Sequence, residues 1–409
     1  MARNGQYHST VTAEGHLVDS GTLSEAMDLI VRGGATFLVR RFTLGSTNLQ
    51  PSQAVIDITA PSDVALGQVL DRLIRLGFYT ANIQEPHVRA ATKDGTAPDD
   101  FYSTTNNATE VYLSGRWQQV ANQRMDAVII VDGDGRKPEC RKLRDVKRGE
   151  RIVCGHHGIR IIPEFKERDR SDFAFMTNEV SSEKKVEWVV GRVTEWMANR
   201  KGKVVVVAGP VVVHTGGVEP LAEIVGGGWV DAVLAGNALA VHDVERALYG
   251  TSLGVDTLSG VPVTNGHQHH MRAINAIRKA GGLKQAVRKG ILKEGVMHAL
   301  ISSKVPYVLA GSIRDDGPLP DVITDVNRAQ EEYGRHLKGA EIVLMLSTML
   351  HSIAVGNMLP SWVRTVCVDI NAQVVTKLAD RGSHQAIGCV TDVGLFLHLL
   401  AERLRVRKS

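Results

Sequence analysis

The chain has 409 residues, 43% of them hydrophobic, which predicts a sizeable core divided between two or three domains. Its net charge is only +4 and aromatic residues make up 5% of it, a composition that argues against a nucleic-acid-binding surface. The N-terminus lacks the apolar segment of a secretion signal, no stretch is long enough to span a membrane, and the four cysteines form no CxxC pair, so we expect a cytoplasmic protein.

Helix signals and strand signals alternate in the first part of the chain, residues 1–105. Thr22-Leu-Ser-Glu25 has the pattern of a capping box and predicts a helix to about Val31. Ser62 predicts the cap of a second helix. Strands are predicted over 35–44 and 54–59.

A βαββαβ order of this kind is the pattern of a ferredoxin-like α+β domain, a module that often regulates or assembles subunits. The polar stretch 87–108 is typical of a linker. Residues 106–180 then show short strand signals and frequent turn signals, which predict a small β-rich domain followed by a linker. The charge run 164–172 within that linker is interpreted as solvated.

Long α/β alternation begins at about residue 181 and continues to residue 409. The predicted strands are short, nearly continuous apolar runs separated by helices, which is typical of a parallel sheet that helices cover on both faces. They are predicted at 203–208, 230–234, 307–310, 341–346, 365–368 and 386–390. We therefore expect a doubly wound, Rossmann-like catalytic domain over 181–409.

Loops of small or polar residues follow these strands, as phosphate binding requires. They are Gly209-Pro210, Ala235–Ala238, Gly311–Asp316, Ser347–His351, Asp369–Asn371 and Thr391–Val393. A carboxylate at a strand end can hold a ribose, and Asp369 is placed for that role. Asp369 and Asp392 could instead cap the helices that follow. Six such loops on one sheet edge favour a dinucleotide site, although the G-x-G-x-x-G pattern is absent.

Histidines and charged residues in the same half are candidates for catalysis. Gly266-His-Gln-His-His270 has spacing that invites a metal interpretation, but no acid or cysteine flanks it at metal-site spacing. We favour a loop that orients substrate or transfers protons, with packing at a helix start as the alternative. Arg314-Asp315-Asp316 follows an apolar strand and is either a site or a surface ion cluster. Lys377 lies on a helix surface, where lysines usually face solvent.

Six segments of this half are long and unusual in composition, namely Asn237–Asp243, Gly250–Gly254, Gly311–Asp321, Ser347–Asn357, Asp369–Asn371 and Thr376–Gly382. Together they resemble one family, the NAD-dependent ornithine cyclodeaminases of archaeal and cyanobacterial type. That group carries the label of a lysine-oxoglutarate reductase/saccharopine dehydrogenase (LOR/SDH) conserved region, and in cyanobacteria a similar module follows an arginine dihydrolase. The resemblance covers essentially the whole chain.

The resemblance implies conversion of L-ornithine to L-proline and ammonia by a homo-oligomer. It also implies an NAD-binding domain related in shape to deoxyhypusine synthase. The residues that the resemblance places against NAD are Asn237, Ala238, Asp316, Thr348, Met349, Leu350, His351, Asp369, Asp392 and Val393.

Ornithine cyclisation would need a cation for the carboxylate, an acid for the far ammonium and a base for the amines. Arg314 and Arg272 are candidates for the cation, and Asp315 is one for the acid. His269 or His270 suits the base, because histidine changes charge near neutral pH. Lys377 is a reserve base and no metal is expected. The alternatives are another NAD-dependent amino-acid dehydrogenase, similar to saccharopine dehydrogenase, or a non-catalytic sensor of NAD or amino acids.

Overall fold

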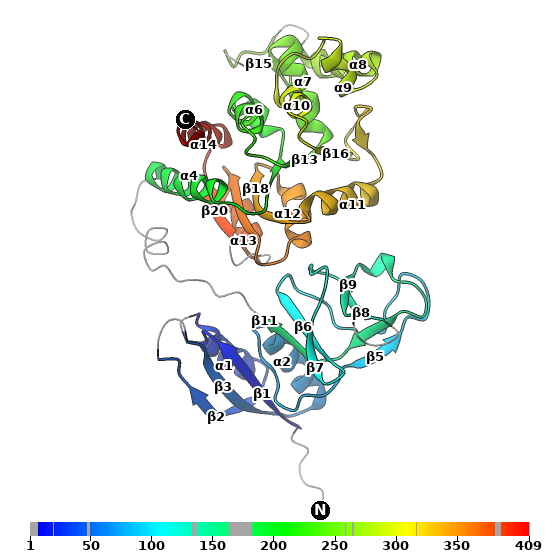
Figure 1. Cartoon of the computed structure of the whole chain (residues 1–409), viewed down its shortest axis with the longest axis vertical. Helices are drawn as coiled ribbons and strands as arrows, with labels where there is room; N and C mark the ends of the chain where they lie inside the picture. Colours follow the sequence, from blue (N-terminus) through cyan, green and yellow to red (C-terminus); the bar gives the residue numbers. More distant parts are fainter. Residues whose placement is uncertain are drawn as a thin grey trace, which may run out of the picture. The chain divides into compact units, whose positions relative to one another are not determined.

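The computed structural model describes residues 7–18, 20–46, 50–132, 137–162, 182–257, 259–263, 266–315, 317–380 and 386–408. The chain forms two compact units. The first comprises Met1–Phe173 and Leu359–Ser361, and the second comprises Ala174–Met358 and Trp362–Ser409. Each unit is described by itself below (Figure 1).

The first unit begins with the predicted βαββαβ order. Its elements are β1 (Tyr7–Gly15), α1 (Thr22–Arg32), β2 (Thr36–Thr43), β3 (Ser52–Ala60), α2 (Asp63–Arg75) and β4 (Tyr79–Thr80). The strands pair antiparallel in the order β2-β3-β1-β4, which confirms the ferredoxin-like prediction. β3 alternates buried and half-buried residues, and its buried face packs into one core with Ile30 of α1 and Leu73 of α2.

The two helix starts in this region differ in their caps. The Ser62 side chain accepts a hydrogen bond from the Ala65 N–H at 3.1 Å, as predicted for the second helix. The capping box predicted at Thr22 is wrong, because Gly21, in a left-handed conformation, is the N-cap of α1, and the Thr22 N–H donates to the Ser20 hydroxyl at 3.2 Å. Thr22 is instead the first helical residue.

Two small antiparallel sheets complete the first unit. One has the order β5 (His87–Ala90), β10 (Arg151–Cys154), β8 (Val128–Val131) and β9 (Glu139–Arg141). The other has the order β11 (Ile159–Ile162), β6 (Ala108–Leu113) and β7 (Arg116–Gln119), and a 3-10 turn, η1, spans Leu143–Asp145. The β-rich prediction is confirmed, but the linker prediction for 87–108 is wrong at its start, because β5 pairs with β10. The charge run at 164–172 lies outside the described residues.

The second unit is built on one parallel sheet of seven strands. Their order is β17 (Val322–Ile323), β16 (Tyr307–Ala310), β13 (Ala232–Gly236), β12 (Lys203–Ala208), β18 (Ala340–Leu346), β19 (Arg364–Asp369) and β20 (Ala386–Val390). Every neighbouring pair is parallel. The central strand β12 is buried from Val204 to Ala208, as its apolar sequence predicts for a sheet covered on both faces.

Helices cover both faces of this sheet (Figure 1). One layer contains α4 (Ser182–Ala198), α6 (Val218–Gly226), α10 (Val296–Ser302) and α14 (Val393–Lys408). The other contains α11 (Val326–Leu337), α12 (Met349–Met358) and α13 (Ala372–Asp380). The remaining elements are α5 (Val211–His214), α7 (Asn237–Tyr249), the hairpin β14 (Thr251–Ser252) and β15 (Val255–Asp256), η2 (Gly266–Gln268), α8 (His269–Ala280) and α9 (Leu283–Arg288). The doubly wound, Rossmann-like prediction is confirmed.

A buried carboxylate joins two helices of this unit. Asp243 of α7 is fully buried and accepts the backbone N–H groups of Val296 and Met297, both at 2.8 Å, at the start of α10. Gly295 precedes that helix with φ of 99°, and a Cβ there would lie 2.7 Å from the Asp243 carboxylate. Among the described residues, none of the helices combines the length and the apolar character needed to cross a bilayer.

Candidate active site

The strand order reverses at β12. β13 and β16 follow it on one side, whereas β18, β19 and β20 lie on the other. Ligands of open α/β sheets bind beyond the carboxyl ends of the strands at such a reversal. The strand ends that meet here are Ala208 of β12 and Leu346 of β18, which pair with each other in register.

The loops after β12 and β18 run against each other at this point. The Gly209 N–H donates to the Leu346 carbonyl at 2.9 Å. A Cβ placed on Gly209 would lie 2.2 Å from the carbonyl oxygen of Ser347, so only glycine fits. Ser347 itself has φ of 47°, a left-handed conformation that non-glycine residues rarely adopt. The loop then enters the N-terminus of α12, where backbone N–H groups favour an anion.

A half-buried histidine links this loop to β13. His351 of α12 has its Nδ1 3.1 Å from the Thr348 hydroxyl. Its ring lies against the backbone of Gly236, where a Cβ would be 2.8 Å from Cε1. Burial lowers the pKa of His351, so the ring is neutral at physiological pH. Tyr333 lies beside it, with ring centroids 6.1 Å apart, and donates to the Ala235 carbonyl at 2.7 Å.

Three of the polar residues predicted to contact NAD already accept hydrogen bonds from backbone N–H groups. Asn237 Oδ1 accepts the Leu319 N–H at 3.1 Å, and Asp369 Oδ1 accepts the Asn371 N–H at 2.8 Å. Asp392 Oδ1 accepts the Leu395 N–H at 2.9 Å, so it caps α14, as its alternative interpretation held. Asp369 does not cap α13. It closes a turn at the end of β19, and its ribose role stays a prediction.

The other predicted cofactor residues surround the same edge. Met349 and Leu350, at the start of α12, are 46% and 73% exposed, an unusual position for large apolar side chains at a strand-to-helix turn. Val393 is buried at the start of α14 and Ala238 is half-buried in α7. The loop predicted at Ala235–Ala238 is wrong, because β13 extends to Gly236 and α7 begins directly at Asn237. Asp316 lies outside the described residues.

The charged residues predicted to act on substrate are more scattered. Asp315 Oδ2 accepts the Ser312 N–H at 2.7 Å, which closes a turn after β16, and the exposed Arg314 lies in that turn. Arg272 is exposed on α8 and donates to Gln268 Oε1 at 3.0 Å. Lys377 is exposed on α13, as its solvent-facing interpretation held. Arg314 and Asp315 thus share one turn, whereas Arg272 and Lys377 lie on two separate helices.

A second cluster is centred on Glu245 of α7, whose side chain is fully buried. Its carboxylate accepts hydrogen bonds from His242 Nδ1 at 3.0 Å, Thr251 Oγ1 at 3.0 Å, and the N–H groups of Leu253 and Gly254 at 3.1 and 2.9 Å. Burial alone would raise the pKa of Glu245, but these hydrogen bonds outweigh it and hold the pKa below its usual value. Glu245 is therefore a carboxylate that only accepts.

The hydrogen-bond directions around Glu245 set the proton position on His269. Thr251 has one hydroxyl hydrogen, which it donates to Glu245. Its oxygen must therefore accept from His269 Nδ1, which is 2.8 Å away. A neutral His269 then carries its hydrogen on Nδ1 and leaves the lone pair on Nε2 free. The Tyr249 ring stacks on His269 with centroids 4.9 Å apart and holds the ring plane.

The cluster extends toward the end of β12 through α5. His214 Nδ1 lies 2.7 Å from the Ser252 hydroxyl, and its ring is 5.1 Å from that of His242. Burial, together with the neighbouring His242, lowers the pKa of His214 and favours the neutral ring. Of the predicted histidines, His269 belongs to this cluster. His270 is half-buried on α8. Within the described part of the chain, no three histidine, cysteine or acidic residues are placed to hold a metal ion.

Family models match nearly the whole chain. Residues 189–400 match the Rossmann-fold part of the C-terminal region of ArgZ-like arginine dihydrolases, and residues 108–190 match the first part of that region. Residues 8–107 match the conserved region of the LOR/SDH bifunctional enzyme. The ornithine cyclodeaminase of Methanocaldococcus jannaschii is 49% identical over 403 residues, which are 96% of this chain and 95% of that protein. The chain belongs to this ornithine cyclodeaminase family.

Longer relatives in the family carry an additional region. The bifunctional arginine dihydrolase/ornithine cyclodeaminase AgrE of Nostoc is 48% identical, and the match covers 96% of this chain but 58% of AgrE. The crystal structure of the cyanobacterial arginine dihydrolase ArgZ superposes with a TM-score of 0.88 at 43% identity, over 100% of this chain and 60% of that one. A ternary complex of AgrE with ornithine and NAD⁺ matches 99% of this chain and 59% of its own, at 46% identity and a TM-score of 0.54. The predicted family is confirmed.

Sequence reasoning missed much of the cluster around Glu245 in this member of the family. The missed side chains are His214, His242, Glu245, Tyr249, Thr251 and Ser252. The available signal was the acid and histidine within the apolar start of α7, in Ala240-Val-His-Asp-Val-Glu245, since such groups are rarely buried without a partner.

Proposed function

We propose that this protein is an NAD-dependent ornithine cyclodeaminase, which converts L-ornithine to L-proline and ammonia. The observation that carries the proposal is the AgrE complex, in which a protein 46% identical to this one holds ornithine and NAD⁺ together. The family relatives of nearly the same length bear the ornithine cyclodeaminase name without the additional region of AgrE. Direct use of arginine is therefore not part of the proposal.

The residues at the reversal of strand order fit NAD. The close approach at Gly209 leaves backbone rather than side chain at the strand ends, and the N-terminus of α12 can face a pyrophosphate. Thr348 and His351 would border the cofactor there, and Asp369 would reach its ribose. NAD, when bound, supplies a reversible hydride acceptor, so that ornithine is oxidised at Cα and reduced again with no net redox change.

The overall reaction conserves atoms and electrons. The bond between Cα and the α-amine breaks, the δ-amine forms a new bond to Cα, and ammonia leaves. The hydrogen taken from Cα as hydride returns to the same carbon in the ring. The δ-ammonium must lose a proton before its nitrogen can attack Cα, and the α-ammonium must lose one before Cα can be oxidised. The departing nitrogen must then regain a proton to leave as ammonia, so the site needs a group that both takes and returns protons close to neutral pH.

His269 is our proposed base. Its neutral form has the free lone pair on Nε2, because Thr251 and Glu245 fix the hydrogen on Nδ1. Glu245 is a carboxylate and stabilises the charge that His269 gains when it takes a proton, as a carboxylate does behind other catalytic histidines. Arg314 or Arg272 for the substrate carboxylate, and Asp315 for the far ammonium, remain proposals based on residue type.

The decisive experiment follows ornithine labelled with heavy nitrogen at the α-amine. With NAD⁺ at a small fraction of the ornithine concentration, we expect unlabelled proline, labelled ammonia and no accumulating NADH, measured by mass spectrometry and absorbance. Accumulation of NADH in proportion to consumed ornithine would instead identify an amino-acid dehydrogenase. Binding of NAD⁺ and ornithine without any turnover would identify a sensor.

We also propose a homo-oligomer that works in the cytoplasm. The edge strand β2 supports the first part, because Leu38 and Phe42 on it are exposed. Four cysteines that are free and buried support a reducing compartment. The mass of the purified protein in solution, measured by light scattering, tests the oligomer, and cell fractionation tests the location.

A further inference from the structure

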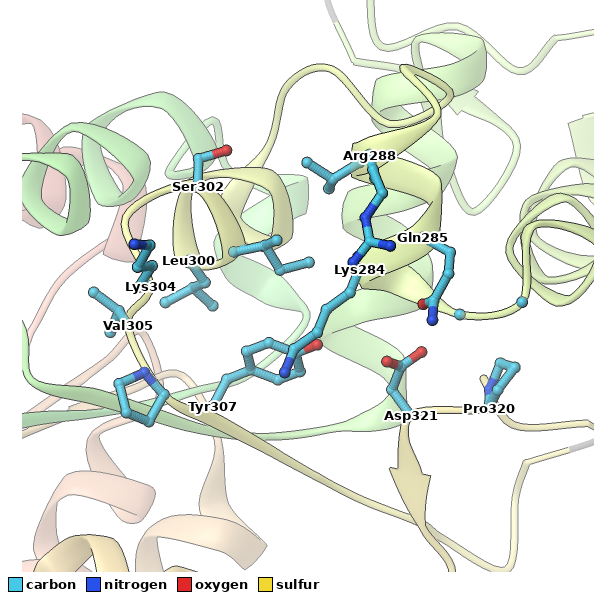
Figure 2. Close-up of a pocket in the computed structure, with 15 residues that line it drawn as sticks. Lys284, Gln285, Arg288, Leu300, Ser302, Lys304, Val305, Tyr307, Pro320 and Asp321 are labelled. Carbon is cyan, nitrogen blue, oxygen red and sulfur yellow. The ribbon is translucent and has the colours of Figure 1, made fainter.

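A cavity of about 940 Å³ lies at the amino ends of strands in the parallel sheet, whereas the proposed NAD site lies at the carboxyl ends (Figure 2). Tyr307, the first residue of β16, and Asp321, which precedes β17, line it. Both strands are parallel to β12, so the cavity opens at their amino ends, whereas NAD would lie at the carboxyl ends. The cavity belongs entirely to the second unit.

Three cationic side chains line this cavity. Lys284 and Arg288 are one turn apart on α9, and Lys304 follows the end of α10 on the other side (Figure 2). All three are exposed, and none forms an ion pair within the described part of the chain. Three unpaired like charges around one cavity repel one another, so a bound anion would relieve that repulsion.

The lining contains one acid, Asp321, whose single negative charge offsets only one of these three positive charges. Asp321 accepts the Leu283 N–H at 2.9 Å, and Tyr307 lies beside it in the lining (Figure 2). Burial, together with the neighbouring Asp321, raises the pKa of Tyr307, so its hydroxyl stays protonated. Gly282, with φ of 122°, brings the backbone within reach of the same carboxylate. Asp321 thus holds the start of α9 to the sheet, and the cations remain available.

The rest of the lining is largely apolar, and the volume of the cavity suits a small organic molecule. The apolar members of the lining include Val287, Leu300, Val305, Pro306 and Pro320. Small-molecule sites have volumes of roughly 300–1,000 Å³ and combine apolar walls with a few polar groups. We propose that this cavity binds a small organic anion that carries at least two negative charges on phosphate or carboxylate groups. The proposal does not depend on the proposed ornithine chemistry.

Binding is tested on the full chain saturated with NAD⁺, so that the cofactor edge is filled. Citrate and ADP, titrated separately by calorimetry, represent the carboxylate and phosphate sources. We expect saturable binding of at least one probe, weakened by added salt because the attraction is between charges. Lys284→Gln, Arg288→Gln and Lys304→Gln should each weaken it about tenfold, the loss expected for one charged hydrogen bond.

Lys279→Gln is the matched control, because Lys279 is an exposed cation on α8 outside the lining. It should leave the affinity unchanged, and equal weakening by this variant would overturn the site in favour of diffuse attraction. Acetylation of the wild-type protein provides a measurement that needs no variant. The bound probe should protect Lys284 and Lys304 but not Lys279. If neither probe bound saturably, the proposal would be overturned. The same holds if a second copy of the chain covered the cavity and prevented binding.

Discussion

Replacing Gly209 with alanine should damage the proposed NAD site directly. The new Cβ would lie 2.2 Å from the Ser347 carbonyl oxygen and 3.0 Å from Thr348 Cβ. Carbon and oxygen atoms that are not bonded require a separation of roughly 3 Å or more, so the loop after β18 must move by about 1 Å. Ser347 cannot yield by rotating a side chain, because the obstructing atom belongs to the backbone.

The magnitude follows from that displacement. Overpacking of this kind costs about 1–3 kcal/mol of stability. A shift of about 1 Å in groups that position a ligand costs up to roughly a hundredfold in function. We therefore expect NAD⁺ affinity to fall by about ten- to a hundredfold in Gly209→Ala, with a lowered melting temperature.

Two further glycines make the experiment a graded series. Gly236→Ala would place its Cβ 2.8 Å from Cε1 of His351, a side chain that can give way in part, so its effect should be intermediate. Gly226→Ala, at the end of α6, meets nothing within 4 Å and should leave NAD⁺ affinity unchanged. Calorimetric titration with NAD⁺ and thermal melting measure all three. Equal NAD⁺ affinities for Gly209→Ala and Gly226→Ala would refute the reasoning.

Three other predictions concern the hydrogen-bond network, a buried acid and a helix cap. Thr251→Val removes the hydroxyl that fixes the His269 proton, so kcat should fall about tenfold with little change in KM, whereas Thr251→Ser should retain activity. Burial raises the pKa of Asp243 from 3.8 to about 6. Its stabilising contribution, about 3 kcal/mol, is fully present below pH 3.8 and is lost as the pH rises through 6, with roughly half of it lost between about pH 5 and 7.5. Ser62→Ala should destabilise the first unit by about 1 kcal/mol through loss of the α2 cap.

Each of these predictions has a measurement that can contradict it. Steady-state kinetics with a full pH profile would contradict the Thr251 prediction if the valine variant kept the wild-type kcat. Denaturation of wild type and Asp243→Asn across that pH range should show a difference in stability that narrows as the pH rises, and a constant difference would contradict it. The melting temperature of Ser62→Ala should be lower than that of Ser62→Thr, because threonine keeps the hydroxyl. Equal melting temperatures would exclude a capping role.

The amino-acid sequence by itself determined the architecture of both halves. The run Val204–Ala208 is apolar without alternation, a pattern typical of a strand that is covered on both faces. β3 alternates because only one of its faces is covered. The order of these local signals then allowed few topologies, and the ferredoxin-like and Rossmann-like predictions are both confirmed. The segments at the strand ends were distinctive enough to indicate the family.

Only the tertiary structure decided which polar groups meet. His214, Glu245 and His269 are far apart along the chain. The periodicity of the sequence does not predict that α5, α7 and α8 place them in one cluster. The same holds for β5, predicted as linker, because its pairing partner β10 lies about sixty residues away. The local sequence pattern predicts whether a residue is buried, because buried positions recur with the period of the helix or strand. Which side chains contact one another depends on how separate helices and strands pack. That packing exists only in the complete tertiary structure.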